Sequence, residues 1–188
     1  GIPINDSESH GMYWVNMPDI SSSVNNIQVQ RGVGTSSNGA SAFGASINVE
    51  TNTLNKEAYG ALDNSFGSFN TLRNTVKAGT GLLNDKFIID TRLSSIQSDG
   101  YVDRSAAELK SFMLSGTWLG ENSTLRATMF SGKERTQQAW YGTPESVING
   151  NLEEITAYAD RNYIFGSDRE NLLTAGRKYN YYTYDNEV

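Results

Sequence analysis

Between residues 58 and 136 the sequence alternates apolar and polar residues in long runs, which short polar turns separate. Alternation with a period of two is typical of a β-strand with one apolar and one polar face. The pattern predicts five consecutive strands, at residues 58–66, 69–81, 86–98, 107–119 and 123–136. Strands of soluble proteins usually have about 5–6 residues, whereas a tilted strand that crosses a membrane needs about 9–11. The length of these runs therefore favours strands in a bilayer, within a mostly β fold.

Two short turns predict the register of four of these strands. A two-residue hairpin at Asn84-Asp85 places mostly apolar pairs on one face and polar pairs on the other. The apolar pairs are Val76 with Leu93, Ala78 with Thr91 and Thr80 with Ile89; the polar pairs are Thr75 with Ser94, Lys77 with Arg92 and Gly79 with Asp90. Lys77 opposite Arg92 is a repulsive pair, which needs water or a nearby acid such as Asp90.

A hairpin at Glu121-Asn122 separates the next two strands into faces in the same way. One face pairs Trp118 with Leu125, Gly116 with Ala127 and Leu114 with Met129; the other pairs Thr117 with Arg126, Ser115 with Thr128 and Met113 with Phe130. The two turns are independent of each other, and each gives one mostly apolar face. This agreement supports the predicted register.

Charged residues indicate which face would meet lipid. Arginine or lysine on the lipid face costs about 2–4 kcal/mol at mid-bilayer and about 0–1 kcal/mol at the interface. The charges well inside the strands all fall on the polar face: Arg73, Lys77, Asp90, Arg92 and Arg126. Lys110 and Lys133 share the apolar side but lie near strand ends. We therefore expect the apolar face to meet lipid, with Trp118 and Phe87 in an interfacial aromatic girdle near the short turns.

The connections between the strands are unequal in length. The turns at residues 84–85 and 121–122 are minimal, whereas residues 99–106 and the segment after residue 136 are longer. Outer-membrane barrels have tight periplasmic turns and long external loops. The junction at residues 66–69 is short for an external loop and could instead be a bulge.

The residues before the strands are rich in glycine and other small residues. Ile27-Gln-Val-Gln predicts a strand, Arg31-Gly32-Val33-Gly34 a glycine turn, and Ile47-Asn48-Val49 a second strand. This order, with the upstream Gly1-Ile2-Pro3-Ile4-Asn5-Asp6, resembles the end of the plug domain of TonB-dependent receptors, the ligand-gated transporters of bacterial outer membranes. The resemblance covers about the first 51 residues, and Val33 stands where the family usually has proline.

The resemblance implies a fragment of a plugged antiparallel transmembrane β-barrel. Residues 1–55 would form the C-terminal part of the plug. Residues 56–188 would form about five first strands of the barrel, with a long extracellular loop at residues 137–188. Because plugged transporter barrels have about 22 strands, this chain would be only the start of the wall.

The same resemblance implies roles for two groups of residues. The family's arginine at the position of Arg31 typically pairs with carboxylates of the barrel wall, so Arg31 is the expected lock between plug and barrel, with partners outside this chain. The loop after the Gly-Ile-Pro segment would lie at the plug apex, where His10, Tyr13 and Trp14 are expected to contact ligand. The alternative is that Trp14 packs inside the plug together with Met12.

The segment after residue 136 is expected to carry its own structure, because long loops without any are uncommon. Thr143 before Pro144 predicts a helix start, residues 151–161 a second helix, and residues 167–170 a capping box before a third. The segment has eight acidic and four basic residues and seven of the ten tyrosines. Acidic, aromatic loops can clasp a neutral or cationic ligand, and Trp140 and Tyr141 are the expected contacts. Packing of these rings on one another and on the rim of the barrel is the alternative.

Composition excludes several classes of function. The net charge of −6 and the lack of a basic cluster make nucleic acid an unexpected partner. With no cysteine and a single histidine, we expect no metal site and no cofactor. The adjacent Glu153 and Glu154 would point apart on a helix, so a glycosidase with paired carboxylates is not expected, nor any other enzyme.

The expected function therefore follows from the family resemblance. It implies a transporter in the bacterial outer membrane that imports a scarce, bulky nutrient with energy from a TonB-type periplasmic protein, whose contact segment would precede Gly1. A ferric siderophore or another iron complex is the first expectation for the cargo, and cobalamin, haem and oligosaccharides remain open. The alternative is a passive structural or adhesive β-protein of the cell surface.

Overall fold

The computed structural model describes residues 3–6, 8–9, 11–33, 44–51, 54–180, 182 and 184–188. The chain divides into two compact units. The first comprises Gly1–Asp63, Thr75–Ser94 and Lys110–Gly132; the second comprises Asn64–Asn74, Ser95–Leu109 and Lys133–Val188.

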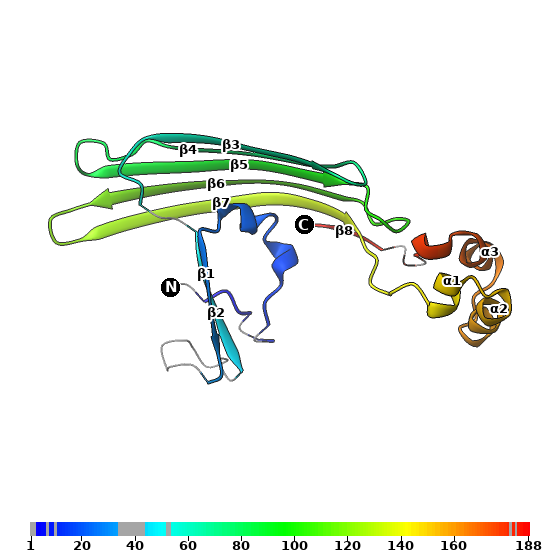
Figure 1. Cartoon of the computed structure of the whole chain (residues 1–188). Coiled ribbons are helices and arrows are strands. Elements are labelled where there is room, and N and C mark those ends of the chain that lie inside the picture. The colour runs from blue at the N-terminus through cyan, green and yellow to red at the C-terminus, as the bar shows by residue number, and fades with distance from the viewer. Residues whose placement is uncertain are drawn as a thin grey trace. The chain divides into compact units, whose positions relative to one another are not determined.

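The dominant element is a six-stranded sheet in which neighbouring strands follow the chain order, so the fold is mostly antiparallel β (Figure 1). Its strands are β3 (Tyr59–Gly67), β4 (Thr71–Gly79), β5 (Phe87–Ser98), β6 (Ala107–Leu119), β7 (Thr124–Gln137) and β8 (Asp185–Glu187). The five predicted strands are confirmed. The short strand β8 was not predicted, because three polar residues carry no apolar alternation.

Strand β8 returns the end of the described chain to the sheet. It pairs antiparallel with β7, with Glu187 opposite Arg135. The ammonium group of Lys133 forms an ion pair with the carboxylate of Glu187. The expected loop at residues 137–188 therefore ends in a strand of the sheet.

The N-terminal segment contains a second, smaller sheet. Strands β1 (Asn26–Arg31) and β2 (Ala45–Glu50) form an antiparallel hairpin, as the sequence predicts, with Ile27 opposite Val49. Two 3-10 turns precede it, η1 (Trp14–Asn16) and η2 (Ile20–Ser23).

The predicted register of the long strands is confirmed by hydrogen bonds. In β4 and β5, the amide of Thr80 donates to the carbonyl of Ile89 at 2.9 Å, and the hydroxyls of Thr71 and Ser98 lie 2.7 Å apart. For β6 and β7, three further contacts agree: Gly120 N to Ser123 O at 2.8 Å, Ser115 Oγ to Thr128 Oγ1 at 3.1 Å, and Arg126 Nε to Thr117 Oγ1 at 3.3 Å.

The turn between β4 and β5 departs from the predicted two-residue hairpin. Leu83 pairs with Phe87, so the loop has three residues. The body of the hairpin keeps the predicted register because Gly81 and Leu82 together oppose a single residue, as in a bulge. Gly81 has a φ of +66°, and a Cβ built on it would lie 2.6 Å from the amide nitrogen of Ala58.

Replacing Gly81 with alanine is expected to destabilise the protein by more than about 1–2 kcal/mol, the usual strain of an L-residue in the left-handed region. The added Cβ would also collide with backbone of residues 56–58, which has no room to yield. Equilibrium unfolding of this variant measures the effect. Gly60→Ala is the control, because a Cβ there meets nothing within 4 Å.

The junction between β3 and β4 is a tight hairpin and not the bulge considered from the sequence. Phe69 and Asn70 occupy the turn with φ of 59° and 53°, and the amide of Thr71 donates to the carbonyl of Ser68 at 3.2 Å. Asparagine tolerates this conformation, whereas phenylalanine there is strained. The Phe69 ring packs edge-on against Tyr101, with 5.4 Å between centroids.

Burial in the first unit is inverted relative to a water-soluble sheet. Polar residues on one face are only 1–8 % exposed: Thr75, Asp90, Arg92, Ser94, Ser111, Ser115 and Thr117. Apolar residues on the other face are 45–65 % exposed: Val76, Ile89, Leu93, Leu114, Leu125 and Met129. These are the two faces predicted from the turns. Such an arrangement is opposite to what the hydrophobic effect selects in water.

Three helices follow β7 in the second unit and pack on one another (Figure 1). They are α1 (Glu145–Asn149), α2 (Leu152–Arg161) and α3 (Gly166–Thr174), followed by the 3-10 turn η4 (Gly176–Lys178). Their small core consists of Val147, Ile155, Ala159, Leu172 and Tyr179. The three predicted helices are confirmed, so the segment does carry its own structure.

Of the three predicted helix starts, only the cap of α2 is formed by a side chain. Asn151 caps α2 by accepting hydrogen bonds from the amides of Glu153 and Glu154. Thr143 does not cap α1, because its hydroxyl donates to the carbonyl of Tyr179 instead. Ser167 forms no capping box, since α3 already begins at Gly166.

Candidate functional site

A buried ion pair in the first unit joins the N-terminal segment to the polar face of the sheet. Asp19, just before η2, and Arg92 of β5 lie with Oδ2 and Nη1 3.3 Å apart, and their side chains are 1 % and 2 % exposed. The other carboxylate oxygen of Asp19 accepts from the hydroxyls of Ser21 at 3.1 Å and Ser22 at 2.7 Å. The carboxylate of Asp19 therefore neutralises Arg92, and the two serine hydroxyls that follow Asp19 hold this carboxylate in place.

On the strand side, the guanidinium of Arg92 is held by its neighbours. Its Nη1 donates to Ser94 Oγ at 2.6 Å, and Ser94 Oγ lies 3.0 Å from Ser111 Oγ of β6. The ring of Phe130 lies 5.9 Å from the guanidinium carbon, within cation–π range. Three neighbouring strands thus position one side of the ion pair.

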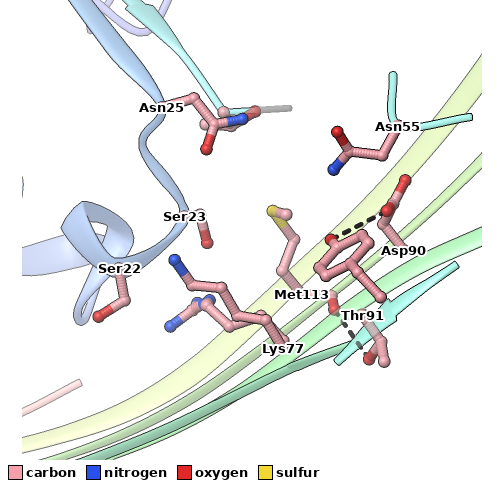
Figure 2. A pocket seen from close by; sticks show the side chains of 11 residues that line it. Ser22, Ser23, Asn25, Asn55, Lys77, Asp90, Thr91 and Met113 are labelled. Carbon is pink, nitrogen blue, oxygen red and sulfur yellow. Dashed lines mark hydrogen bonds between the residues drawn. The ribbon is translucent and has the colours of Figure 1, made fainter. Parts of the chain in front are cut away.

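The sequence did not identify this pair. It placed Lys77 opposite Arg92 and named water or a nearby acid such as Asp90 as what the pair needs. In the structure Asp90 instead accepts a hydrogen bond from the Tyr59 hydroxyl at 3.0 Å (Figure 2). The sequence did show two cations, Lys77 and Arg92, facing each other on the polar face. It gave no indication that Asp19 is the partner, because Asp19 lies 73 residues before Arg92.

Beside the ion pair lies a polar cavity of about 130 Å³ (Figure 2). Its walls come from the N-terminal segment and from β3 to β6, and are lined by Ser22, Ser23, Asn25, Thr51, Asn55, Tyr59, Lys77, Asp90, Thr91, Arg92 and Met113. A cavity of this size can hold several waters or a small ion.

The predicted lock residue Arg31 lies elsewhere. It is the last residue of β1, opposite Ala45, and its side chain is exposed. It forms no ion pair with any residue in the described part of the chain. Its role as a lock stays a prediction, since the expected partners lie outside this chain.

The predicted ligand contacts near the N-terminus are partly accessible. His10 lies outside the described residues. Tyr13 and Trp14 are 55 % and 50 % exposed, and Trp14 opens the turn η1. Trp14 is therefore not buried inside the N-terminal segment, which was the alternative, and its ring remains available for contact.

The predicted contacts Trp140 and Tyr141 belong to a cluster of four rings in the second unit. The Trp140 ring stacks on Tyr182 with 6.3 Å between centroids. Tyr182 also meets Tyr141 edge-on at 5.8 Å and Tyr184 at 6.3 Å. Trp140 is nevertheless 74 % exposed, and Tyr141 and Tyr184 are each 60 % exposed. The rings pack on one another, as one alternative held, and still offer broad apolar surface.

A buried asparagine holds this cluster in place. The amide nitrogen of Asn180 donates to the carbonyls of Asp103, Arg104 and Gln138 at 2.8–3.1 Å, and its side-chain oxygen accepts from the amide of Tyr182 at 3.0 Å. Asn180 is 2 % exposed. Tyr182 and Tyr184 are among the seven tyrosines that the sequence places in this segment. Nothing in the sequence indicated the role of Asn180.

Replacing Asn180 with alanine is expected to loosen the aromatic cluster. The change leaves three partly buried carbonyls without this donor and frees the backbone of Tyr182, so the stack on Trp140 should be populated less. Fluorescence anisotropy of Trp140, with the other two tryptophans replaced by phenylalanine, should fall. Asn149→Ala on the exposed end of α1 should leave it unchanged, and equal anisotropy in both variants would contradict the proposed support.

Within the described residues, no helix has the length and apolarity to cross a membrane, and no group of three or more His, Asp or Glu side chains could hold a metal ion. No family model matches the chain, and comparisons with curated proteins and with solved structures found no significant similarity.

Proposed function

We propose that the chain is part of a TonB-dependent receptor of the bacterial outer membrane, which imports a scarce, bulky nutrient. Residues 1–55 would be the C-terminal part of the plug, and residues 56–188 the first barrel strands. The observation that carries the proposal is the inverted sheet, with its polar face buried and its apolar face exposed. Together with strands of 12 to 14 residues in β5, β6 and β7, it matches a wall that faces lipid outward.

Aromatic residues at both ends of the strands support the same assignment. Phe87 and Trp118, near the short turns, are 48 % and 40 % exposed. At the opposite strand ends, Phe66, Phe69 and Tyr101 are 80 %, 46 % and 49 % exposed. Aromatic rings at the two membrane interfaces are typical of outer-membrane barrels.

The proposed mechanism requires no bond chemistry. Tyr13 and Trp14 of the plug apex would contact ligand, and so would the four-ring cluster of the external loop. A TonB-type periplasmic protein would then supply the energy to rearrange the plug. Because the ion pair between Asp19 and Arg92 fastens the N-terminal segment to the wall, any rearrangement that moves Asp19 has to break it.

A ferric siderophore or another iron complex is our first proposal for the cargo. Cobalamin, haem or an oligosaccharide would be imported by the same mechanism. The exposed rings of Trp140 and Tyr141 suit ligands with broad apolar faces. A passive adhesive surface protein would also use such rings, but it has no need of a polar segment fastened against the sheet.

Uptake measurements separate these functions. Cells that lack the gene should lose growth or uptake on one single source of iron, cobalamin or glycan, and the gene should restore it. A transporter of this kind loses uptake when the proton-motive force or the TonB-type partner is removed. Uptake that is unaffected by either removal would support the passive protein and contradict the proposal.

A further inference from the structure

We propose that the polar cavity beside Asp19 and Arg92 is a binding site for a small inorganic anion, chloride in size. The site lies in the first unit, and its proposed anion contacts, Lys77 and Ser23, have no part in the transport proposal. The inference is therefore independent of which cargo, if any, the protein imports.

Of the two cations that line the cavity, Arg92 has a carboxylate partner and Lys77 does not. Four titratable groups line it: Tyr59, Lys77, Asp90 and Arg92. Arg92 is neutralised by Asp19 at 3.3 Å. Lys77 lies on the neighbouring strand, opposite Arg92 in the register of β4 and β5. Lys77 forms no ion pair with a carboxylate in the described part of the chain, so this cation of a repulsive cross-strand pair has no carboxylate in direct contact.

The one acid among the lining residues, Asp90, is hydrogen-bonded to Tyr59. Asp90 Oδ1 accepts the hydroxyl of Tyr59 at 3.0 Å. The Tyr59 ring is pressed against Gly79, where a Cβ would lie 2.2 Å from ring carbon Cε1 and 2.6 Å from Asp90 Oδ1. This close packing fixes the carboxylate beside the tyrosine.

At the Lys77 end of the cavity, Lys77 can only donate hydrogen bonds, and the hydroxyl of Ser23 can donate or accept. Lys77 carries three N–H donors and no acceptor, and its side chain extends toward Ser23 in the cavity (Figure 2). Ser23 is 5 % exposed, and its buried hydroxyl has no hydrogen-bond partner within the described residues. A buried hydroxyl without a partner costs about 1–3 kcal/mol. An acceptor with negative charge would satisfy Ser23 and compensate Lys77 at once.

The size of the cavity agrees with this ligand. Its volume of about 130 Å³ is several times the roughly 10–15 Å³ that one water needs by the same measure. A halide with two or three waters therefore fits. Because the anion would contact groups from both the N-terminal segment and the sheet, binding would stabilise their association.

Bromide and anomalous diffraction test the site directly. Crystals of the detergent-solubilised protein grown in bromide should show an anomalous peak in the cavity, within hydrogen-bond distance of Lys77 Nζ and Ser23 Oγ. The peak should be absent in Lys77→Met and several-fold weaker in Ser23→Ala. Lys86→Met, at an exposed lysine of the β4–β5 turn, should retain it.

Each alternative result decides against the site. Three results would overturn the proposal: water density in the cavity without an anomalous peak, peaks only at exposed lysines, or a peak that persists in Lys77→Met. As a measurement in solution, replacing chloride by gluconate at constant ionic strength should lower the Tm of the wild type and of Lys86→Met. The Tm of Ser23→Ala should fall less. An equal fall in all three proteins would also overturn it, even if Lys77→Met failed to fold.

Discussion

Replacing Asp19 with asparagine is expected to lower the free energy of unfolding by about 3–5 kcal/mol, the usual effect of removing one partner of a buried ion pair. The change leaves the guanidinium of Arg92 without its carboxylate, in a position where that side chain is only 2 % exposed. The hydroxyls of Ser21 and Ser22 lose a charged acceptor at the same time. Equilibrium unfolding of the protein in lipid vesicles measures the effect.

The matched control is the same substitution in an exposed pair. Asp160 bonds Arg169 at 2.5 Å, but the two side chains are 59 % and 28 % exposed, so Asp160→Asn should cost only about 0–1 kcal/mol. A double-mutant cycle with Arg92→Met isolates the pair: the double variant should be more stable than the sum of the single effects predicts. Equal, small effects of Asp19→Asn and Asp160→Asn would show that the buried pair does not fasten the N-terminal segment.

Replacing Leu93 with arginine is expected to destabilise the folded protein in a bilayer by about 2–4 kcal/mol, the cost of a lipid-facing arginine at mid-bilayer. Leu93 lies in the middle of β5 on the apolar face and is 58 % exposed. The sign of the effect is informative, because an arginine at an equally exposed position in water is close to neutral.

A second leucine on the same face provides the depth control. Leu125, next to the start of β7, is 65 % exposed. If that end lies at the membrane interface, Leu125→Arg should cost only about 0–1 kcal/mol. Unfolding in vesicles compares the two variants. Equal effects at both positions would contradict a membrane-embedded sheet.

The sheet could be predicted because its information is local. Alternation sets each strand, and the hairpin at Glu121-Asn122 fixes a register that the contact between Ser115 and Thr128 confirms. The same alternation separated buried polar residues from exposed apolar ones without reference to any other part of the chain.

The features that were missed depend on contacts distant in sequence or on backbone strain. The partner of Arg92 lies in another segment, and nothing local distinguishes Asp19 from other acids. The bulge at Gly81 arises because backbone of residues 56–58 approaches it closely. Phe69 occupies a turn position that its residue type disfavours, so no turn signal marked it. Asn180 organises the ring cluster through backbone carbonyls, which leave no trace in composition.

The three tryptophans allow the central claim, a sheet whose apolar face contacts lipid, to be tested directly. Trp118 lies on that face and is 40 % exposed, whereas Trp14 and Trp140 lie elsewhere. With both of these replaced by phenylalanine, the fluorescence of Trp118 should be strongly quenched by phospholipids brominated on their acyl chains and weakly by acrylamide in the water. Strong quenching by acrylamide and none by brominated lipid would place the face in water and contradict the account.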